Sequence, residues 1–314
     1  MSSSLAAPVA AVRIGTRRSP LAVRQTELVV GLLTDAWPEL ACEVTPLDTR
    51  GDRTQASGEP LPAIGGKGLF TEELERALRE GTIDLAVHSL KDLPTDQSVD
   101  VAIGALCQRG DPRDCVVSRG NLLLAQLRAG AVVGTSSLRR AAQLHLLHPE
   151  LETRSIRGNV DTRIRKVRAG EYDAVLLAAA GVTRLGLEPE VAEWLSVERM
   201  LPAPGQGTLA VQCRAADEPV LRLLSAIDDP PTRAAVTAER AFLAALGSGC
   251  AAPVGAHAVA ASGGEVRLDA LVATPDGHEV VRVGGEGRLE EIGARLAREA
   301  LAAGAKHILE AVRA

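Results

Sequence analysis

Residues 131–149, "AVVGTSSLRRAAQLHLLHP", change from strand-like to helical spacing within a few positions. An apolar start leads into a polar turn, and the remainder has the spacing of a helix. The same order occurs near the start of the chain, where "VRIGT" (12–16) precedes "SPLAVRQTELVVGLLTDAW" (19–37). There Ser19 is a favoured N-cap residue, and Pro20 stands at the first helical position. Strands separated by helices predict α/β units with a mainly parallel sheet.

A second pair of similar segments supports two related lobes. The segments "DLAVHSLKD" (84–92) and "DAVLLAAAGVTR" (173–184) are both interpreted as buried strands that lead into polar loops. The segment "LPAPGQGTLAVQCR" (201–214) is rich in Pro and Gly and then strand-like, so we expect it to carry the chain back into the first lobe. Crossings near residues 108–112 and 201–207 would form a hinge with a cleft between the lobes.

A third unit is expected after "DDPPT" (228–232). It contains a helix (232–247), three strand patterns and a long C-terminal helix pattern (289–313), which indicate a small α+β domain. The predicted fold class is therefore α/β, with two lobes, a hinge and this added domain. We expect domain 1 over residues 10–107 and 206–225, domain 2 over residues 112–202, and domain 3 over residues 230–314.

The composition argues against several classes of protein. Aromatic residues make up 2% of the 314 residues, whereas single-stranded nucleic-acid binding needs aromatic stacking platforms. The five cysteines show no CxxC spacing, which predicts a reducing compartment and no disulfide framework. No stretch approaches the roughly 20 apolar residues of a membrane span. We therefore expect a cytoplasmic protein that binds neither nucleic acid nor membrane.

Charge is unevenly distributed along the chain. The net charge is −5, yet residues 131–170 contain eight Lys or Arg residues and three acidic residues. Focused positive charge inside an acidic protein indicates an anionic ligand. For Arg165, Lys166 and Arg168 the alternative is a solvated helix face.

Both strand–turn–helix units place cations and hydroxyls at the turn, which is where α/β sheets bind ligands. A helix N-terminus offers free N–H groups to an anion, and arginine binds carboxylates through paired N–H groups. Helix capping alone would explain the hydroxyls, but it does not require arginines. The hydroxyls at the two turns are Thr16, Ser19, Thr135, Ser136 and Ser137. A pocket for several carboxylates is predicted from Arg17, Arg18, Arg139, Arg140, Arg157 and Arg163.

The segment "HSLKD" places Lys91 and Asp92 directly after an apolar strand. A carboxylate beside cations stays ionised and can stabilise a developing cation or move protons; the alternative is a local salt bridge. His88, within the strand, is expected to be a half-buried structural residue. The loop "GGKGLF" (65–70) lacks the spacing of a phosphate-binding loop and is interpreted as a mobile glycine-rich loop, for which a lid is one conceivable role. No His, Asp or Glu cluster has metal-ligand spacing, so no metal is expected.

Cys250 lies in the small-residue stretch "GSGCAAPVG" (247–255). A catalytic nucleophile would need a base and an orienting residue, and His257 alone does not provide that signature. A structural cysteine would be wrapped by apolar side chains. The third interpretation is a covalent tether for a prosthetic group.

These motifs together resemble the porphobilinogen deaminase (hydroxymethylbilane synthase) family. The similarity runs from about Arg13 to the C-terminus through "RIGTRRSPLA", "GGKGLFTEELE", "DLAVHSLKDLPT", "GTSSLRRAAQL", "RGNVDTR", "LPAPGQG" and "AERAFLAALGSGCAAPVGAH". The resemblance implies two lobes like those of type II periplasmic binding proteins and a third domain that carries the cysteine. Two departures are Ser248, where the family usually has glycine, and Arg18, where glutamine is common.

The resemblance also implies an activity: condensation of four porphobilinogen molecules, with loss of ammonia, into hydroxymethylbilane. It implies a dipyrromethane cofactor attached through Cys250, and Asp92 as the catalytic residue that stabilises an azafulvene-like cation. The residues implied to hold the cofactor's carboxylates are Lys91, Thr135, Ser137, Arg139 and Arg140. Those implied to bind substrate and nearby pyrroles are Arg17, Ser19, Arg157, Arg163, Arg184 and Gln206. By the same resemblance we expect a monomer.

Overall fold

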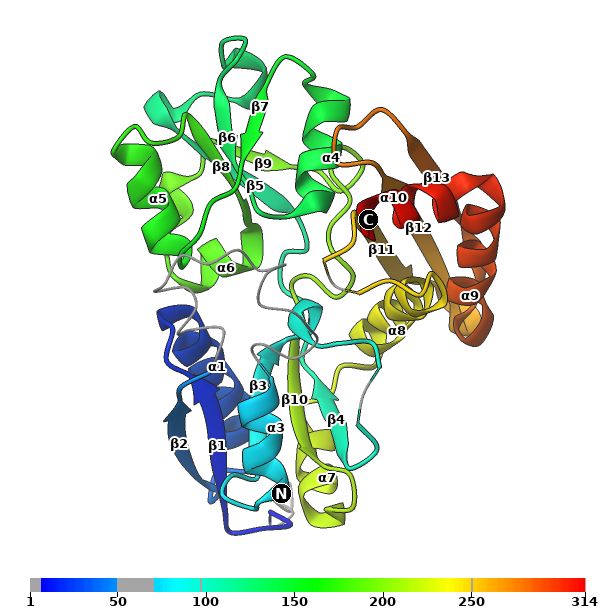
Figure 1. Ribbon diagram of the computed structural model, residues 1–314. Coiled ribbons are helices and arrows are strands. Elements are labelled where there is room, and N and C mark those ends of the chain that lie inside the picture. Colours follow the sequence, from blue (N-terminus) through cyan, green and yellow to red (C-terminus); the bar gives the residue numbers. More distant parts are fainter. Residues whose placement is uncertain (1–6, 50–70, 97, 250, 314) are drawn as a thin grey trace. The chain divides into compact units, whose positions relative to one another are not determined.

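The computed structural model describes residues 7–49, 71–96, 98–249 and 251–313. The chain forms two compact units, one of Met1–Arg109 with Thr208–Pro230 and one of Gly110–Gly207 with Pro231–Ala314. The unit boundaries fall in or beside the two segments in which crossings are predicted. The second unit contains two separate sheets (Figure 1). The hinge, the cleft and the boundaries of three domains stay predictions.

The first unit is built on a five-stranded sheet of order β2-β1-β3-β10-β4. Its strands are β1 (Ala11–Arg17), β2 (Ala41–Leu47), β3 (Leu85–Ser89), β4 (Val101–Leu106) and β10 (Leu209–Arg214). Strand β1 pairs in parallel with β2 and β3, whereas β10 is antiparallel to both β3 and β4. The sheet is therefore mixed, with two parallel and two antiparallel pairings, so the expectation of a mainly parallel sheet holds only for β1, β2 and β3. The return of the chain into the first lobe through β10 is confirmed.

Helices cover both faces of this sheet. They are α1 (Pro20–Ala36), α3 (Glu72–Arg79) and α7 (Glu218–Ser225). Val29 of α1 and Leu223 of α7 join one apolar cluster with Val87 and Val211, while Leu74 of α3 packs on the opposite face with Ala86. The alternation of side chains along β3 explains this division, because successive residues of a strand face opposite sides. The predicted loop 65–70 lies outside the described residues.

The second unit repeats the same topology in a sheet of order β7-β6-β8-β5-β9. Its strands are β5 (Asp114–Ser118), β6 (Val132–Gly134), β7 (Glu152–Arg154), β8 (Ala174–Ala178) and β9 (Glu193–Leu195). Strand β6 is parallel to β7 and β8, and β5 is antiparallel to β8 and β9. The helices are α4 (Leu138–Leu147), α5 (Val160–Arg168) and α6 (Ala179–Arg184). Two similar lobes are thus confirmed.

One aspartate at the same place in each lobe marks the repeat. Asp84, just before β3, accepts a hydrogen bond from the Arg13 backbone N–H at 3.0 Å. Asp173, just before β8, accepts one from the Val132 backbone N–H at 2.8 Å. Partial burial alone would raise the pKa of Asp84, but hydrogen bonds from Arg13 and Arg214 lower it to about 2. These two aspartates provide a residue-by-residue alignment of the lobes.

The polar loop predicted after residue 178 is wrong, because α6 begins there. Ala179, Ala180, Gly181 and Val182 are buried, and Val182 joins the apolar cluster beneath α5. Small apolar residues permit a helix to follow the strand directly at this position. Short 3-10 turns complete the lobes and the C-terminal part, at Leu90–Asp92, Arg119–Asn121, Leu124–Gln126, Glu188–Glu190 and Ser262–Gly264.

The C-terminal part of the second unit is an antiparallel sheet of order β11-β12-β13 packed against helices. Its elements are α8 (Pro230–Ala245), β11 (Val254–Ala260), β12 (Glu265–Ala273), β13 (Val280–Arg288), α9 (Leu289–Ala300) and α10 (Lys306–Arg313). Phe242, Leu268 and Leu296 lie in its core. The predicted fold class, two α/β lobes with a small α+β part, is confirmed.

The single helix predicted over residues 289–313 is interrupted. A π-helical turn spans Leu301–Ala305, and Gly304 has φ of 110°, outside the helical range. Glycine adopts positive φ without the steric penalty of a side chain, so the break falls there. Among the helices of the described ranges, none is long and apolar enough to cross a membrane.

Candidate active site

The turn between β6 and α4 is shaped by its own hydroxyls. The Thr135 Oγ1 atom accepts a hydrogen bond from the Ser137 backbone N–H at 3.1 Å, and Ser137 Oγ accepts one from the Arg140 backbone N–H at 3.4 Å. Ser137 is thus the N-cap of α4, and Ser19 caps α1 in the same way through the Ala22 N–H. Capping is confirmed for both serines, and each hydroxyl keeps its own O–H to donate.

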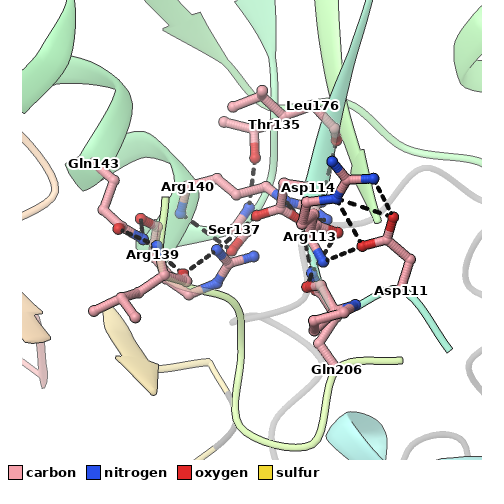
Figure 2. Close-up of polar contacts among 12 residues, drawn as sticks. Asp111, Arg113, Asp114, Thr135, Ser137, Arg139, Arg140, Gln143, Leu176 and Gln206 are labelled. Carbon is pink, nitrogen blue, oxygen red and sulfur yellow. Dashed lines mark hydrogen bonds and ion pairs between the residues drawn. The ribbon is translucent and has the colours of Figure 1, made fainter. Parts of the chain in front are cut away.

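Arg139 and Arg140 follow the cap and are buried, not solvent-facing as turn residues would be. Arg139 donates through Nη1 to Asp114 at 2.7 Å, and Arg140 donates through Nη2 to the same carboxylate at 2.7 Å (Figure 2). The Gln206 amide donates to Asp114 at 2.9 Å. One carboxylate at the start of β5 therefore accepts hydrogen bonds from two guanidinium groups and an amide.

The electrostatics of this cluster follow from its burial. Asp114 is fully buried, and burial alone would raise the pKa of its carboxyl, but Arg139 and Arg140 outweigh that effect and hold the pKa far below its usual range. Burial lowers the pKa of Arg139, yet a guanidinium stays protonated near neutrality. Two cations and one anion leave a net positive charge. The buried Nε of Arg139 has no hydrogen-bond partner among the residues that the structure describes.

The cluster also fixes the segment that precedes β10. The Leu201 carbonyl accepts from Arg139 Nη1 at 2.7 Å and from the Gln143 amide at 2.9 Å. Gly205 donates its N–H to the buried Glu239 of α8 at 2.7 Å. These bonds hold Gln206 beside Asp114.

The remaining predicted arginines of the second unit are more open. Arg163 donates through Nε to the Gly158 carbonyl at 2.8 Å, and Arg184 donates to the Gly207 carbonyl at 2.6 Å. Arg157 is half-buried and has no hydrogen bond or ion pair with any residue that the structure describes. Gly158 has φ of 111°, and a Cβ there would lie 2.6 Å from Thr162, so glycine is required next to Arg157.

Arg165 and Arg168 of α5 are exposed, and Lys166 is half-buried. The solvated helix face is therefore confirmed for Arg165 and Arg168, and Lys166 lies at its half-buried edge. Their charges do not contribute to the buried cluster around Asp114. The positive charge that the sequence concentrates in residues 131–170 is thus divided between a surface and an interior.

In the first unit, the turn that ends β3 presents Lys91 and Asp92. Asp92 is exposed and, across the described part of the chain, makes no hydrogen bond or ion pair, so the alternative of a local salt bridge is wrong. Arg17 is half-buried at the end of β1. Arg18 pairs with Asp48 at 2.7 Å with 62% of its side chain exposed, which makes it a surface ion pair.

Two features of the interior were not found from the sequence. Asp114 is one, although "RGDPRDC" (109–115) does place an acid at the first residue of an apolar strand. The other is a row of buried polar residues, His88, Thr208 and Gln212, each with a side-chain atom that has no hydrogen-bond partner. His88 is buried, not half-buried as expected, and burial together with the Arg17 charge lowers its pKa to about 4.

Cys250 lies outside the described residues. The other four cysteines are free thiols. Burial raises the pKa of Cys115 to about 12 and that of Cys213 to about 11, and it also raises the pKa of Cys42. Cys107 is buried. Since the thiolate is the reactive form, none of these four is suited to attack an electrophile.

The scaffold and its charges define a class of protein: a two-lobed α/β protein with arginines at the carboxyl ends of its strands. Comparison with known families identifies the group more closely. Residues 12–222 match the family model "Porphobilinogen deaminase, dipyromethane cofactor binding domain", and residues 233–302 match "Porphobilinogen deaminase, C-terminal domain". The chain belongs to the porphobilinogen deaminase family, as its motifs predicted.

Individual relatives agree with this assignment. A porphobilinogen deaminase of Roseiflexus castenholzii is 49% identical over 94% of this chain and 97% of its own length. One of Acidothermus cellulolyticus is 47% identical over 98% of this chain and 93% of its own length. The fold also resembles the crystal structure of the methionine binding protein MetQ, with 12% identity and a TM-score of 0.45 over 72% of this chain and 93% of that one.

Proposed function

We propose that this protein condenses four porphobilinogen molecules, with release of ammonia, into hydroxymethylbilane on a dipyrromethane primer attached to Cys250. The family match carries the proposal: it spans both lobes and the C-terminal part, and the second matched region contains Cys250. It confirms the transferase class and the type of cofactor that the motifs predicted. The roles of individual residues are proposals.

The buried cluster is chemically suited to a group that carries carboxylates. A net positive charge and an Arg139 Nε–H without an acceptor are what a buried carboxylate requires as partners. The residues that would hold the cofactor are Lys91, Thr135, Ser137, Arg139 and Arg140. When bound, the cofactor supplies a tethered pyrrole chain to which incoming units are added.

Cys250 is proposed as the attachment point because the alternatives in the described sequence are poor nucleophiles. Cys115 and Cys213 are fully buried with raised pKa values. On either side of Cys250, Gly249 and Ala251 are exposed, and Ser248 is buried. Small, exposed residues on both sides of this position suit a covalent tether.

Asp92 is proposed as the catalytic residue. Loss of ammonia from porphobilinogen leaves positive charge on the substrate, and an ionised carboxylate stabilises charge that develops in the transition state. Asp92 is exposed and makes no ion pair with any residue that the structure describes, so its charge is available to substrate. The proposed substrate-binding residues are Arg17, Ser19, Arg157, Arg163, Arg184 and Gln206, since the substrate carries two carboxylates.

The first experiment is the intact mass of the purified protein, followed by peptide mapping of residues 247–255. We expect a mass excess of two porphobilinogen units less two ammonia, located on Cys250. An unmodified chain that acquires this excess on incubation with porphobilinogen is an apo-enzyme. A chain that never acquires it is a two-lobed anion-binding protein, and the proposed function is then wrong.

We also propose that the enzyme acts as a cytoplasmic monomer that binds neither membrane nor nucleic acid. A net charge of −5 gives no overall attraction to polyanions, which supports the last point. Light scattering on the eluate of a size-exclusion column measures the molar mass directly. A mass of twice 32.8 kDa would contradict the monomer.

A further inference from the structure

Asp114 is the centre of the buried cluster, and neither the sequence motifs nor the family match assigns it a role. Its two oxygens accept hydrogen bonds from Arg139 at 2.7 Å, from Arg140 at 2.7 and 3.2 Å, and from Gln206 at 2.9 Å. All three partners are proposed ligand-binding residues, and all three are buried. Figure 2 shows their side chains converging on this one carboxylate.

The first lobe is an internal control for this arrangement. Asp114 pairs with Ala178, five residues after Asp173, and Leu209 pairs with Ser89, five residues after Asp84. Leu209 therefore occupies the position of Asp114, and it lies in an apolar cluster. Counting from the two N-cap serines, Leu21 and Ala22 occupy the positions of Arg139 and Arg140.

The same topology thus forms with a leucine, a leucine and an alanine where the second lobe has three charges. Burying charges is costly, and apolar side chains commonly replace a buried ion cluster without loss of stability. The topology by itself therefore does not call for a buried carboxylate at this position. A charge cluster that the topology does not call for is better explained by a ligand.

The two arginines differ in how many of their nitrogens donate hydrogen bonds within the protein. Arg140 uses Nε and Nη2 on Asp114 and Nη1 on the Leu176 carbonyl, so all three nitrogens are engaged within the protein. Within the described ranges, Arg139 donates only through Nη1, to Asp114 and the Leu201 carbonyl, and its Nε has no acceptor. Asp114 thereby fixes the direction of the remaining Arg139 donor.

We propose that Asp114 is a positioning residue for the anionic ligand: it orients Arg139 as the direct carboxylate donor, with Arg140 and Gln206 as its supports. This inference rests on the proposed function, since the anion it addresses is a carboxylate of the tethered pyrrole chain. Loss of the Asp114 charge then slows assembly of the cofactor on Cys250, even in protein that is fully folded.

The test measures how fast unloaded protein acquires the two-unit mass excess during incubation with porphobilinogen. The unloaded protein is produced in cells that cannot make porphobilinogen, and each variant is assayed well below its unfolding temperature. Asp114→Asn is expected to load about tenfold more slowly or worse, because a hydrogen bond to a charged group is lost at the positioned arginine.

The matched control is Asp111→Asn. Asp111 is also ion-paired, with Arg113 at 2.7 Å, and in the structure described it does not bond to Arg139, Arg140 or Gln206. It is expected to load at the wild-type rate. A purely structural Asp114 would give a lower unfolding temperature and wild-type loading, and that result overturns the proposal.

If Asp114→Asn does not fold, the loading rates of two variants that both lack the Arg140 side chain are compared instead. Arg140→Ala keeps one buried ion pair, whereas Asp114→Leu/Arg140→Ala keeps Arg139 without its carboxylate and retains the net positive charge. The double variant is expected to load more slowly than Arg140→Ala, and equal rates overturn the proposal. Wild-type protein that fails to load contradicts the proposed function itself, so the two failures are distinguishable.

Discussion

The two lobes have one topology but distribute their charges in opposite ways. In the second lobe, Asp114 and two arginines form a buried cluster at the end of the sheet. In the first lobe the corresponding interior is apolar, and the charged group at the end of the central strand is the exposed Asp92. Gly181 occupies the position of Asp92 in the second lobe, eight residues after Asp173. The topology forms with either charged or apolar residues at these positions. We therefore connect the charged residues with the proposed function and not with the topology.

The opposite sheet faces differ as well. His88 lies four residues after Asp84, and its counterpart four residues after Asp173 is Leu177, which belongs to an apolar cluster. The first lobe therefore buries an imidazole where the second buries a leucine. The unpartnered Nε2 of His88 is a feature of the first lobe alone in this comparison.

The largest effect is expected when the second lobe's carboxylate is copied into the first. Leu209→Asp places a charge among apolar side chains without an arginine partner, and it should destabilise the protein by about 3–5 kcal/mol near neutral pH. Burial raises the pKa of such a carboxyl, so the deficit shrinks as pH falls and the group becomes neutral. Chemical denaturation checks this, with Leu209→Asn as the uncharged control. A Leu209→Asp deficit that matches Leu209→Asn at every pH would contradict the role of charge.

The next effect tests whether catalysis depends on the acid of the first lobe. Asp92→Ala should nearly abolish turnover, and Asp92→Asn should lower kcat by about 10²–10³-fold, the size of one lost transition-state contact. The unfolding temperature should not change, since Asp92 is exposed and has no partner in the described part of the chain. Asp96→Asn, four residues further on and also exposed, is the control. A wild-type rate in Asp92→Ala would remove Asp92 from the mechanism.

A smaller effect concerns His88. Its folded pKa of about 4 lies below the ordinary value of 6.5, so the unfolded chain binds the proton more tightly. This contribution to stability is complete above pH 6.5, declines as pH falls and is gone near pH 4, with a total on the order of 3 kcal/mol. His88→Gln should flatten the stability profile in that window. An unchanged slope would show that His88 is not buried as a neutral group.

The smallest effects compare the two helix caps. Ser19→Ala and Ser137→Ala should each lower stability by about 1 kcal/mol, because each hydroxyl accepts one backbone N–H of its helix. Thermal unfolding measures that loss. Ser137→Ala should slow the loading of Cys250 more than Ser19→Ala does, since Ser137 is proposed to hold the cofactor and Ser19 only the incoming substrate. Slow loading in Ser19→Ala with normal loading in Ser137→Ala would reverse the assignment.

Much of the fold could be predicted from local pattern. The N-cap at Ser19, the return of residues 201–214 into the first lobe and the repeat of the lobes all follow from short-range signals. The helix α6 was missed because its residues, Ala179 to Val182, continue the apolar run of β8 without a break. The interruption at Gly304 was missed because one glycine in a helical pattern is ordinarily tolerated.

The candidate site could be predicted only in part, because short-range patterns locate residues but do not show whether they are buried. Motif residues such as Asp92 and Arg139 could be located from the sequence, but their burial could not. Arginines at a turn are expected at the surface, whereas Arg139 and Arg140 are buried because Asp114 neutralises one of their charges. Asp114 precedes Arg139 by 25 residues and Arg140 by 26, and it is brought near them by the pairing of both β5 and β6 with β8.

The family, most of the periodic elements, the caps and the residue types that suit a carboxylate-rich ligand could be predicted from the sequence, because these depend on neighbours within a few positions. The tertiary structure alone decided which charges are exposed and which are buried. It left Asp92 open to solvent, enclosed Asp114 with two arginines and kept one Arg139 donor unsatisfied. The physical reason is that desolvation and ion pairing depend on strand register and packing, which join residues far apart in the chain.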